Sequence, residues 1–260
     1  MADAILKYPN PKFEGMSQVT DMAIKCSLKA YYPNVDQRGG AERLALLNKA
    51  TTLPALVDFC IEGYRAWADA VLMGAGAYLK IGEYSDEITE AKKYVKRKII
   101  DYLTGADFSC ASDYDRWHRN ICLNLSNDTK FFANYSAYRK TCKDKFKNKR
   151  GFTIGNAQKF LNMLMKDLYA CLSQTPNLLP AYEDYFKYCH MPLDSYILRF
   201  VDDIRHREAI KKPMRRYTWS SLDSYDAYLD EQNDIRTYVE KYNPDITALQ
   251  TEFVVWPLYK

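Results

Sequence analysis

Residues 151–172 read GFTIGNAQKFLNMLMKDLYACL, and this stretch decides the fold class of the chain. Its apolar side chains recur every three or four positions, which is the period of an α-helix that lays one face on a core. These side chains are Ala157, Phe160, Leu161, Leu164, Met165, Leu168, Tyr169 and Leu172. The opposite face of this helix is polar. It consists of Gln158, Lys159, Asn162 and Lys166, which follow one another along successive helical turns. This polar face could bind a phosphate or a partner, or it could equally lie in water.

The same helical period recurs along most of the chain on both sides of this stretch. The segments that carry it are residues 19–30, 41–49, 53–80, 86–104, 112–125, 128–147, 192–204 and 220–242. Pro192 is expected in the first turn of its helix, and Ser220–Asp223 is expected as the capping box of the last one. Glu252–Leu258 is the one candidate strand, and with nothing to pair it is expected to be an extended tail. We therefore predict an all-α fold, a compact bundle of about eight helices in one domain, 1–260, with residues 148–152 as the place for any subdomain break.

Composition and charge narrow the class of protein. Charged residues make up 27% of the chain and apolar residues 47%, which is typical of a globular protein in water. The net charge is only +4, so an anion-binding surface would have to be local. The uncharged run Ala70–Leu79 is too short to span a bilayer, and the first residues lack the apolar segment of a signal peptide. We expect a cytoplasmic protein without membrane contact.

The seven cysteines are spread along the chain, and no two of them form a C-x-x-C pair. This spacing points to neither a zinc site nor a thioredoxin-like motif. Most of these cysteines fall on apolar stripes, as reduced cysteines of an intracellular protein do. The sequence therefore predicts no metal ion and no cofactor.

The strongest candidate for a binding surface is the basic run 139–150, RKTCKDKFKNKR, in which seven cations accompany one acid. Aromatic residues beside cations suit single-stranded nucleic acid, through phosphate contact and base stacking. The run leads to the glycines of the next helix start, where free N–H groups attract anions. The residues expected to supply charge are Lys143, Lys147, Lys149 and Arg150, and those expected to make directed contacts are Gln158, Lys159 and Asn162. The alternative is a solvated helix end in which the lysines complement the helix dipole.

A second candidate is the segment 189–194, CHMPLD. An acid near a histidine raises the basicity of the imidazole and can orient it as a general base, and this role is predicted for His190 with Asp194. In the alternative, Asp194 stabilises the helix start and His190 bonds locally. A third candidate is the cation–aromatic cluster 116–119, RWHR, which could grip a phosphate or a base. Within it, His118 is expected to be an exposed surface residue.

Two polar residues, Gln232 and Arg236, lie on the apolar stripe of the last long helix, together with Tyr225, Leu229 and Ile235. Buried polar groups cost about 1–3 kcal/mol unless they are paired, so both residues should have specific partners. The partner could be a ligand, the backbone of another helix or a carboxylate. Convergence of Gln232, Arg236, His190 and Asn162 in the deepest cleft would mark a site.

Two resemblances bear on the function. The segments GFTIGNAQKFLNMLMKDLY, CHMPLDSYIL and YTWSSLDSYDAYLDEQNDIR resemble parts of uncharacterised bacterial and phage proteins, which implies no activity. The spacing from Arg199 to His206 resembles the motif of the HEPN family of helical ribonucleases, although Phe200 stands where that family usually has a polar residue. This second resemblance implies a metal-independent ribonuclease with Arg199 and His206 in its active site. We expect Arg199 near the buried face of its helix.

The leading functional prediction is a binding protein for RNA, DNA or another phosphate-bearing ligand, without a cofactor. The first alternative is a metal-independent, HEPN-like ribonuclease that uses His190 or His206 with a neighbouring arginine. The second alternative is a non-catalytic helical adaptor or homo-oligomer whose interface is formed by some of the 22 tyrosines.

Overall fold

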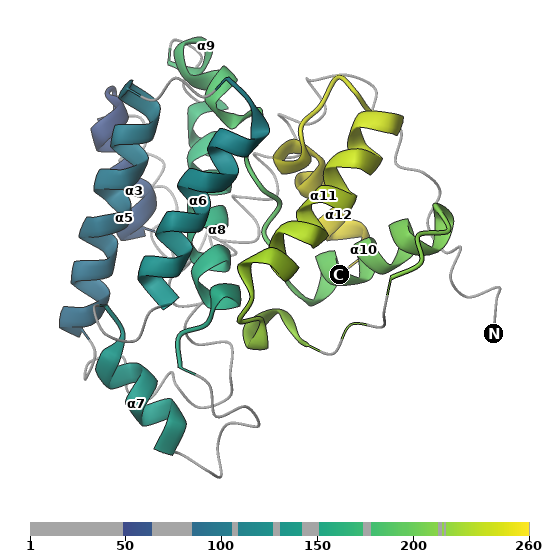
Figure 1. The fold of residues 1–260 in the computed structure, drawn as a ribbon. Helices are drawn as coiled ribbons and strands as arrows, with labels where there is room; N and C mark the ends of the chain where they lie inside the picture. Colours follow the sequence, from purple (N-terminus) through teal and green to yellow (C-terminus); the bar gives the residue numbers. More distant parts are fainter. Residues whose placement is uncertain are drawn as a thin grey trace, which may run out of the picture.

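The computed structural model describes residues 49–63, 85–105, 109–126, 131–141, 151–173, 178–212, 215 and 217–259. These residues form helices, turns and irregular segments without a strand, so the predicted all-α class is confirmed (Figure 1). The predicted helix in 19–30, most of the one in 41–49 and residues 64–80 of the one in 53–80 lie outside the described residues. None of the helices that the structure describes is long and apolar enough to cross a membrane.

The helices before residue 174 are α3 (Leu53–Gly63), α5 (Ser85–Gly105), α6 (Ala111–Ser126), α7 (Ala133–Thr141) and α8 (Ile154–Ser173). Those after it are α9 (Leu179–Tyr182), α10 (Ser195–Arg207), α11 (Tyr225–Tyr242) and α12 (Ala248–Tyr259), with short 3-10 turns η2 (Glu183–Phe186) and η3 (Trp219–Ser221). For α5 and α6 the structure agrees with the predicted bounds to one residue at each end.

Helix α8 is the centre of the fold. Helices α3 and α6 pack on it from one side, and η3 and α11 contact it from the other (Figure 1). All residues from Ile154 to Leu172 are buried, including the polar face. The prediction that this polar face is open to water is therefore wrong, because the surrounding elements cover it and supply its partners.

The start of α8 is also buried. Gly155 lets the helix approach η3 so closely that a Cβ at this position would lie 1.6 Å from the carbonyl oxygen of Trp219. The N–H of Gly155 donates to the carbonyl of Leu222 at 2.8 Å, and the N–H of Asn156 donates to Oγ1 of Thr153 at 3.1 Å. The N–H groups that were expected to attract an anion at this helix start are thus occupied by the protein itself.

Two predicted helix starts differ from the structure. Helix α10 begins after Asp194, whose side chain accepts the N–H groups of Tyr196 and Ile197 at 2.9 and 3.0 Å, so Pro192 precedes the helix. A capping box does form near residue 220, but it belongs to η3. Helix α11 is capped instead by Ser224.

The predicted extended tail Glu252–Leu258 is wrong, because this segment lies in α12. At the start of α12, the backbone N–H of Thr247 donates to Oε1 of Gln250 at 2.8 Å and the N–H of Gln250 donates to Oγ1 of Thr247 at 3.1 Å. This reciprocal cap favours a helix, and burial of Phe253 and Val255 on the side of α10 and α11 overrides the strand propensity of the valines.

Candidate functional site

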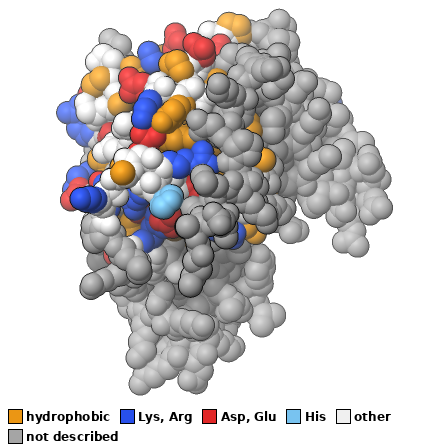
Figure 2. Space-filling model, turned by 90° about the vertical axis from the view of Figure 1, so that its right-hand side faces the viewer, with side chains coloured by type: hydrophobic (Ala, Val, Ile, Leu, Met, Phe, Trp, Pro, Cys, Tyr) orange, Lys and Arg blue, Asp and Glu red, His pale blue; other side chains and the backbone are white. Residues whose placement is uncertain are grey.

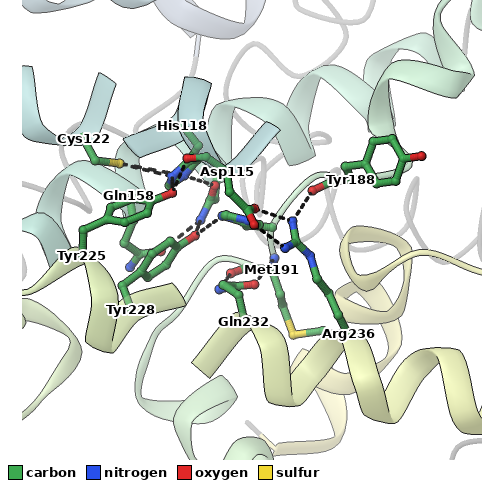
Figure 3. A network of polar contacts seen from close by, with 12 residues as sticks. Asp115, His118, Cys122, Gln158, Tyr188, Met191, Tyr225, Tyr228, Gln232 and Arg236 are labelled. Carbon is green, nitrogen blue, oxygen red and sulfur yellow. Dashed lines mark hydrogen bonds and ion pairs between the residues drawn. The ribbon is translucent and has the colours of Figure 1, made fainter. Parts of the chain in front are cut away.

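Hydrogen bonds join Asn162, His190 and Arg236 in one network between α6, α8 and α11, and Gln232 bonds to the backbone of the segment 189–194. Figure 3 shows the side chains of Gln232 and Arg236 in this network. The four side chains thus lie together, but in the interior: only Arg236 among them lines the cleft beside the network, whereas convergence of all four in a cleft was to mark a site. His190, Asn162 and Gln232 are fully buried, and Arg236 is half-buried. They belong to a set of hydrogen bonds that also includes residues which the sequence did not single out. These are Asp115, Cys122, Tyr225 and Tyr228.

A directed chain of hydrogen bonds runs through this network. Nδ2 of Asn162 donates to the hydroxyl oxygen of Tyr228 at 2.8 Å. The Tyr228 hydroxyl lies 2.7 Å from Nδ1 of His190, whose Nε2 lies 2.8 Å from Oδ1 of Asp115. Because a carboxylate only accepts, a neutral His190 donates from Nε2 and receives the Tyr228 hydrogen at Nδ1. The donors and acceptors thus fix the direction of each hydrogen bond from Asn162 through Tyr228 and His190 to Asp115.

Arg236 and Gln232 of α11 hold the other end of the network. The guanidinium of Arg236 donates to both carboxylate oxygens of Asp115, at 3.0 and 2.8 Å, and to the carbonyl oxygen of Tyr188 at 3.0 Å. Gln232 accepts from the N–H of Met191 at 3.0 Å and donates to its carbonyl oxygen at 2.8 Å. Both polar residues on the apolar face of α11 thus have the specific partners that their positions predict, a carboxylate and a backbone.

His118 is buried in the network, so the expectation that it is exposed is wrong. Its Nε2 donates to Oδ1 of Asn162 at 2.8 Å, and its Nδ1 lies 2.9 Å from the Tyr225 hydroxyl and 3.5 Å from Sγ of Cys122. The buried face of α6 contains Tyr114 and His118 as well as Ile121 and Leu125, so His118 points into the core. The rings of His118 and His190 lie 4.5 Å apart.

Burial controls the protonation of the network. Burial, helped by the positive charge of Arg236, lowers the pKa of His190 to about 4, although Asp115 acts in the opposite sense. Burial and the neighbouring His190 lower the pKa of His118 well below its usual range. Burial would raise the pKa of Asp115, but hydrogen bonds from His190 and Arg236 outweigh it and hold that pKa below its usual range. At neutral pH both imidazoles are therefore neutral and the carboxylate is ionised.

The polar face of α8 is bonded to the segment 189–194 and to the network. Gln158 accepts from the N–H of Leu193 at 3.1 Å and donates to its carbonyl oxygen at 2.9 Å. Asn162 donates to Oε1 of Gln158 at 3.1 Å as well as to Tyr228. Gln158 and Asn162 thus have no hydrogen left to offer to a nucleic acid.

Asp194 pairs with Lys159 rather than with His190. Nζ of Lys159 lies 3.0 Å from Oδ2 of Asp194, and Nε1 of Trp256 donates to the same oxygen at 3.0 Å. Burial acts to raise the pKa of Asp194, but Lys159 and the helix N–H groups lower it overall. The predicted His190–Asp194 pair is therefore replaced by two separate pairs, His190 with Asp115 and Asp194 with Lys159.

The residues of the HEPN-like motif lie outside this network on α10. Arg199 and His206 are both exposed, which contradicts the expectation that Arg199 lies near the buried face. The guanidinium carbon of Arg199 lies 5.0 Å from the ring centroid of Tyr196. Lys143, Lys147, Lys149 and Arg150 of the basic run lie outside the described residues.

A cleft of about 620 Å³ adjoins the network at Arg236. Its polar lining includes four acids and two bases, namely Glu183, Asp184, Glu240, Asp245, Lys187 and Arg236. The acids outnumber the bases, so the field in this cleft disfavours a polyanion. The guanidinium of Arg236 is in addition already held by Asp115.

The network stabilises the packing of three helices and offers little for catalysis. The side chain of His190 is fully buried, and its two nitrogens are both bonded within the protein. A general base must reach the proton that it abstracts, so His190 could act only if α6 and α11 separated. Among the described residues, the side chains that are close enough together to hold a metal ion lie elsewhere. They are Cys60, Asp167 and Cys171, between α3 and α8.

Comparisons of this chain with protein-family models, with curated proteins and with solved structures found no match.

Proposed function

We propose that this chain binds nucleic acid without sequence preference, through the cations of the basic run 139–150. The observation that supports this proposal is the way both ends of the run are held on α7. The N–H of Phe152 donates to Oγ of Ser136 at 2.9 Å, and the ring of Phe152 stacks on Phe132 with centroids 3.9 Å apart. The chain thus leaves α7 after Thr141 and is bonded to it again at Phe152, so the segment 142–150, which carries five of the seven cations, starts and ends at α7.

A second group of cations lies on the helix that supports α7. Glu87 in the first turn of α5 accepts the N–H groups of Asn134 and Tyr135, at 2.8 and 3.2 Å, and so fixes the start of α7 on α5. Five of the seven residues 92–98 of α5 are Lys or Arg. Two of them are paired with acids, Lys93 with Glu90 and Lys96 with Asp58. The proposed surface combines the basic run with this face of α5.

A third group of cations, in residues 205–215, is held in ion pairs. Arg205, Lys212 and Arg215 pair with carboxylates of α10 and α11, at Asp202, Asp230, Glu231 and Asp234. Figure 2 shows the corresponding mixture of blue and red side chains on that side of the molecule. A field that attracts phosphate is therefore favoured at residues 139–150 and not here.

The binding is proposed to be electrostatic because the expected directed contacts are not available. Gln158, Lys159 and Asn162 are buried and bonded to other parts of the protein. What is left is the charge of the run. Tyr135, which precedes the run, is buried, and Phe146 within it lies outside the described residues. Contacts of this kind release counterions and are strongly salt-dependent.

The test is the combined reversal Lys147→Glu, Lys149→Glu and Arg150→Glu, measured by fluorescence anisotropy with labelled single-stranded RNA and DNA. Loss of about three phosphate contacts should weaken binding at low salt and reduce the slope of log affinity against log salt by about 2–3. A control with the same change in net charge reverses the exposed residues Lys187, Lys211 and Lys241. Wild-type protein that does not bind at low salt, or equal losses in both triple variants, would contradict the proposal.

A catalytic alternative is favoured by one observation on α10. Arg199 and His206 are both exposed and lie two turns apart, on the same side of the helix. A metal-independent ribonuclease would cleave RNA in the presence of a chelator and would lose this activity in His206→Ala. No cleavage by the wild type on structured and unstructured RNA would eliminate this alternative.

A further inference from the structure

Three potential metal ligands meet inside the interface between α3 and α8, away from the surface proposed above. They are Cys60 of α3 and Asp167 and Cys171 of α8, and their ligand atoms all lie within 4.8 Å of one another. Asp167 and Cys171 are four residues apart, so their side chains leave α8 on one face, a turn apart. Cys60 faces them from α3, which packs on α8 along its length (Figure 1).

The spacing of the two sulfur atoms matches one kind of ligand. Two thiolates bound to one tetrahedral zinc ion, each at about 2.3 Å, are about 3.8 Å apart. The Sγ atoms of Cys60 and Cys171 lie 3.7 Å apart. In a disulfide they would approach to about 2.05 Å, and the carboxylate of Asp167 would have no part in the bond.

The charge balance of the cluster points the same way. All three side chains are buried, and the carboxylate-bearing Asp167 is only 1% exposed. A divalent cation bound between the three side chains would stabilise the anionic forms of all of them.

We propose that Cys60, Asp167 and Cys171 bind a zinc ion that joins α3 to α8. Two thiolates and one carboxylate suit zinc better than magnesium or calcium, which take oxygen ligands. Three protein ligands leave the fourth position of the tetrahedron for a water molecule or another small ligand. Binding releases the thiol protons, so two S–H bonds are exchanged for two Zn–S bonds and the protons pass to solvent.

This site escapes a search for short motifs because its ligands come from two helices. Cys60 and Cys171 are 111 residues apart in the sequence, and the closer pair, Asp167 and Cys171, has the spacing of a helix turn rather than of a C-x-x-C loop. The sequence therefore predicted no metal ion, and only the packing of α3 on α8 brings the ligands together.

The test uses the full chain, reduced and stripped of metal with a chelator, and titrated with Co²⁺. The wild type should bind one Co²⁺ per chain with sulfur-to-cobalt charge-transfer absorption and the visible bands of a tetrahedral site, and Zn²⁺ should displace it. Cys60→Ser and Cys171→Ser should lose the charge-transfer absorption. Asp167→Asn should keep it but bind Co²⁺ more weakly. Cys110→Ser is the matched control, because Cys110 is exposed and distant in the sequence from both helices.

Elemental analysis of protein purified without a chelator should also find one zinc per chain. No absorption change in the wild type on addition of Co²⁺ would overturn the proposal, whatever the variants do. So would an unchanged spectrum in folded Cys171→Ser protein, or a Cys60–Cys171 disulfide found by mass spectrometry as the state of the native protein. Circular dichroism identifies variants that fail to fold, and the wild-type titration then decides.

Discussion

Lowering the pH from 7 to 5 should destabilise this protein through its buried histidines. His190 has a folded pKa of about 4 because of burial and Arg236, whereas an unfolded histidine titrates near 6.5. Between pH 6.5 and pH 4, the imidazole of residue 190 is therefore protonated in the unfolded chain but largely unprotonated in the native chain. Stability from this group is fully present above pH 6.5 and is lost as the pH falls from 6.5 to 4.

The magnitude follows from the two pKa values. At pH 5 an unfolded imidazole is almost fully protonated, while a group with a pKa near 4 is protonated in about a tenth of the molecules. Integrating the difference between pH 7 and pH 5 gives a loss of about 2 kcal/mol from His190 alone. His118 contributes with the same sign, because burial lowers its pKa too. Glu252 acts in the opposite sense, because burial raises its pKa and the native state gains as it takes up a proton.

The measurement is urea unfolding at pH 7 and pH 5 for the wild type, His190→Gln and His206→Gln. Glutamine retains a donor for Asp115 but cannot take up a proton, so His190→Gln should lower stability at pH 7 and flatten its dependence on pH by about 2 kcal/mol. His206 is exposed, so His206→Gln should follow the wild type. The reasoning fails if His190→Gln loses as much stability on acidification as the wild type does.

Two further predictions concern the environment of α8. Lys166 and Glu252 form a buried ion pair, so Lys166→Met alone should cost about 3–5 kcal/mol in the free energy of unfolding, and addition of Glu252→Leu should restore most of it. No recovery in the double variant would show that Lys166 acts through another contact. Gly155→Ala should cost about 3 kcal/mol or more because its Cβ would collide with the carbonyl oxygen of Trp219, whereas Gly105→Ala, where nothing lies within 4 Å, should change thermal stability by less than about 1 kcal/mol. Equal effects of the two alanines in a thermal melt would contradict this.

The helices could be predicted because burial of one face leaves a period in the sequence. This held for α5 and α6, whose predicted and observed ends differ by one residue. Periodicity says which residues share a face, but it does not say whether another element covers that face. The row Gln158, Lys159 and Asn162 is typical of a wet face, and the structure covers it with segment 189–194 and α11.

Polar residues within an apolar stripe predicted the network more reliably than the polar row of α8 did. Gln232 and Arg236 stood out because a buried polar group without a partner is costly, and both have partners in the structure. Asp115 and Tyr228 were missed because an acid next to a cation–aromatic cluster and a tyrosine on an apolar stripe break no such rule. The basic run 139–150 could be recognised from charge alone, and its residues beyond 141 lie outside the described part of the chain.

The polar groups of the buried network are already hydrogen-bonded within the protein, which makes them poor sites for a ligand. The donors of Asn162 and Gln158 and both nitrogens of His190 are engaged within the protein. A ligand that sought these groups would have to break bonds made in a dry environment, where each one lost leaves an unsatisfied polar group. Recognition at the surface carries no such cost, because exposed cations exchange only water and counterions for phosphate. The energetics thus separate the buried polar centre, which stabilises the helices, from the basic run 139–150, where we propose that nucleic acid binds.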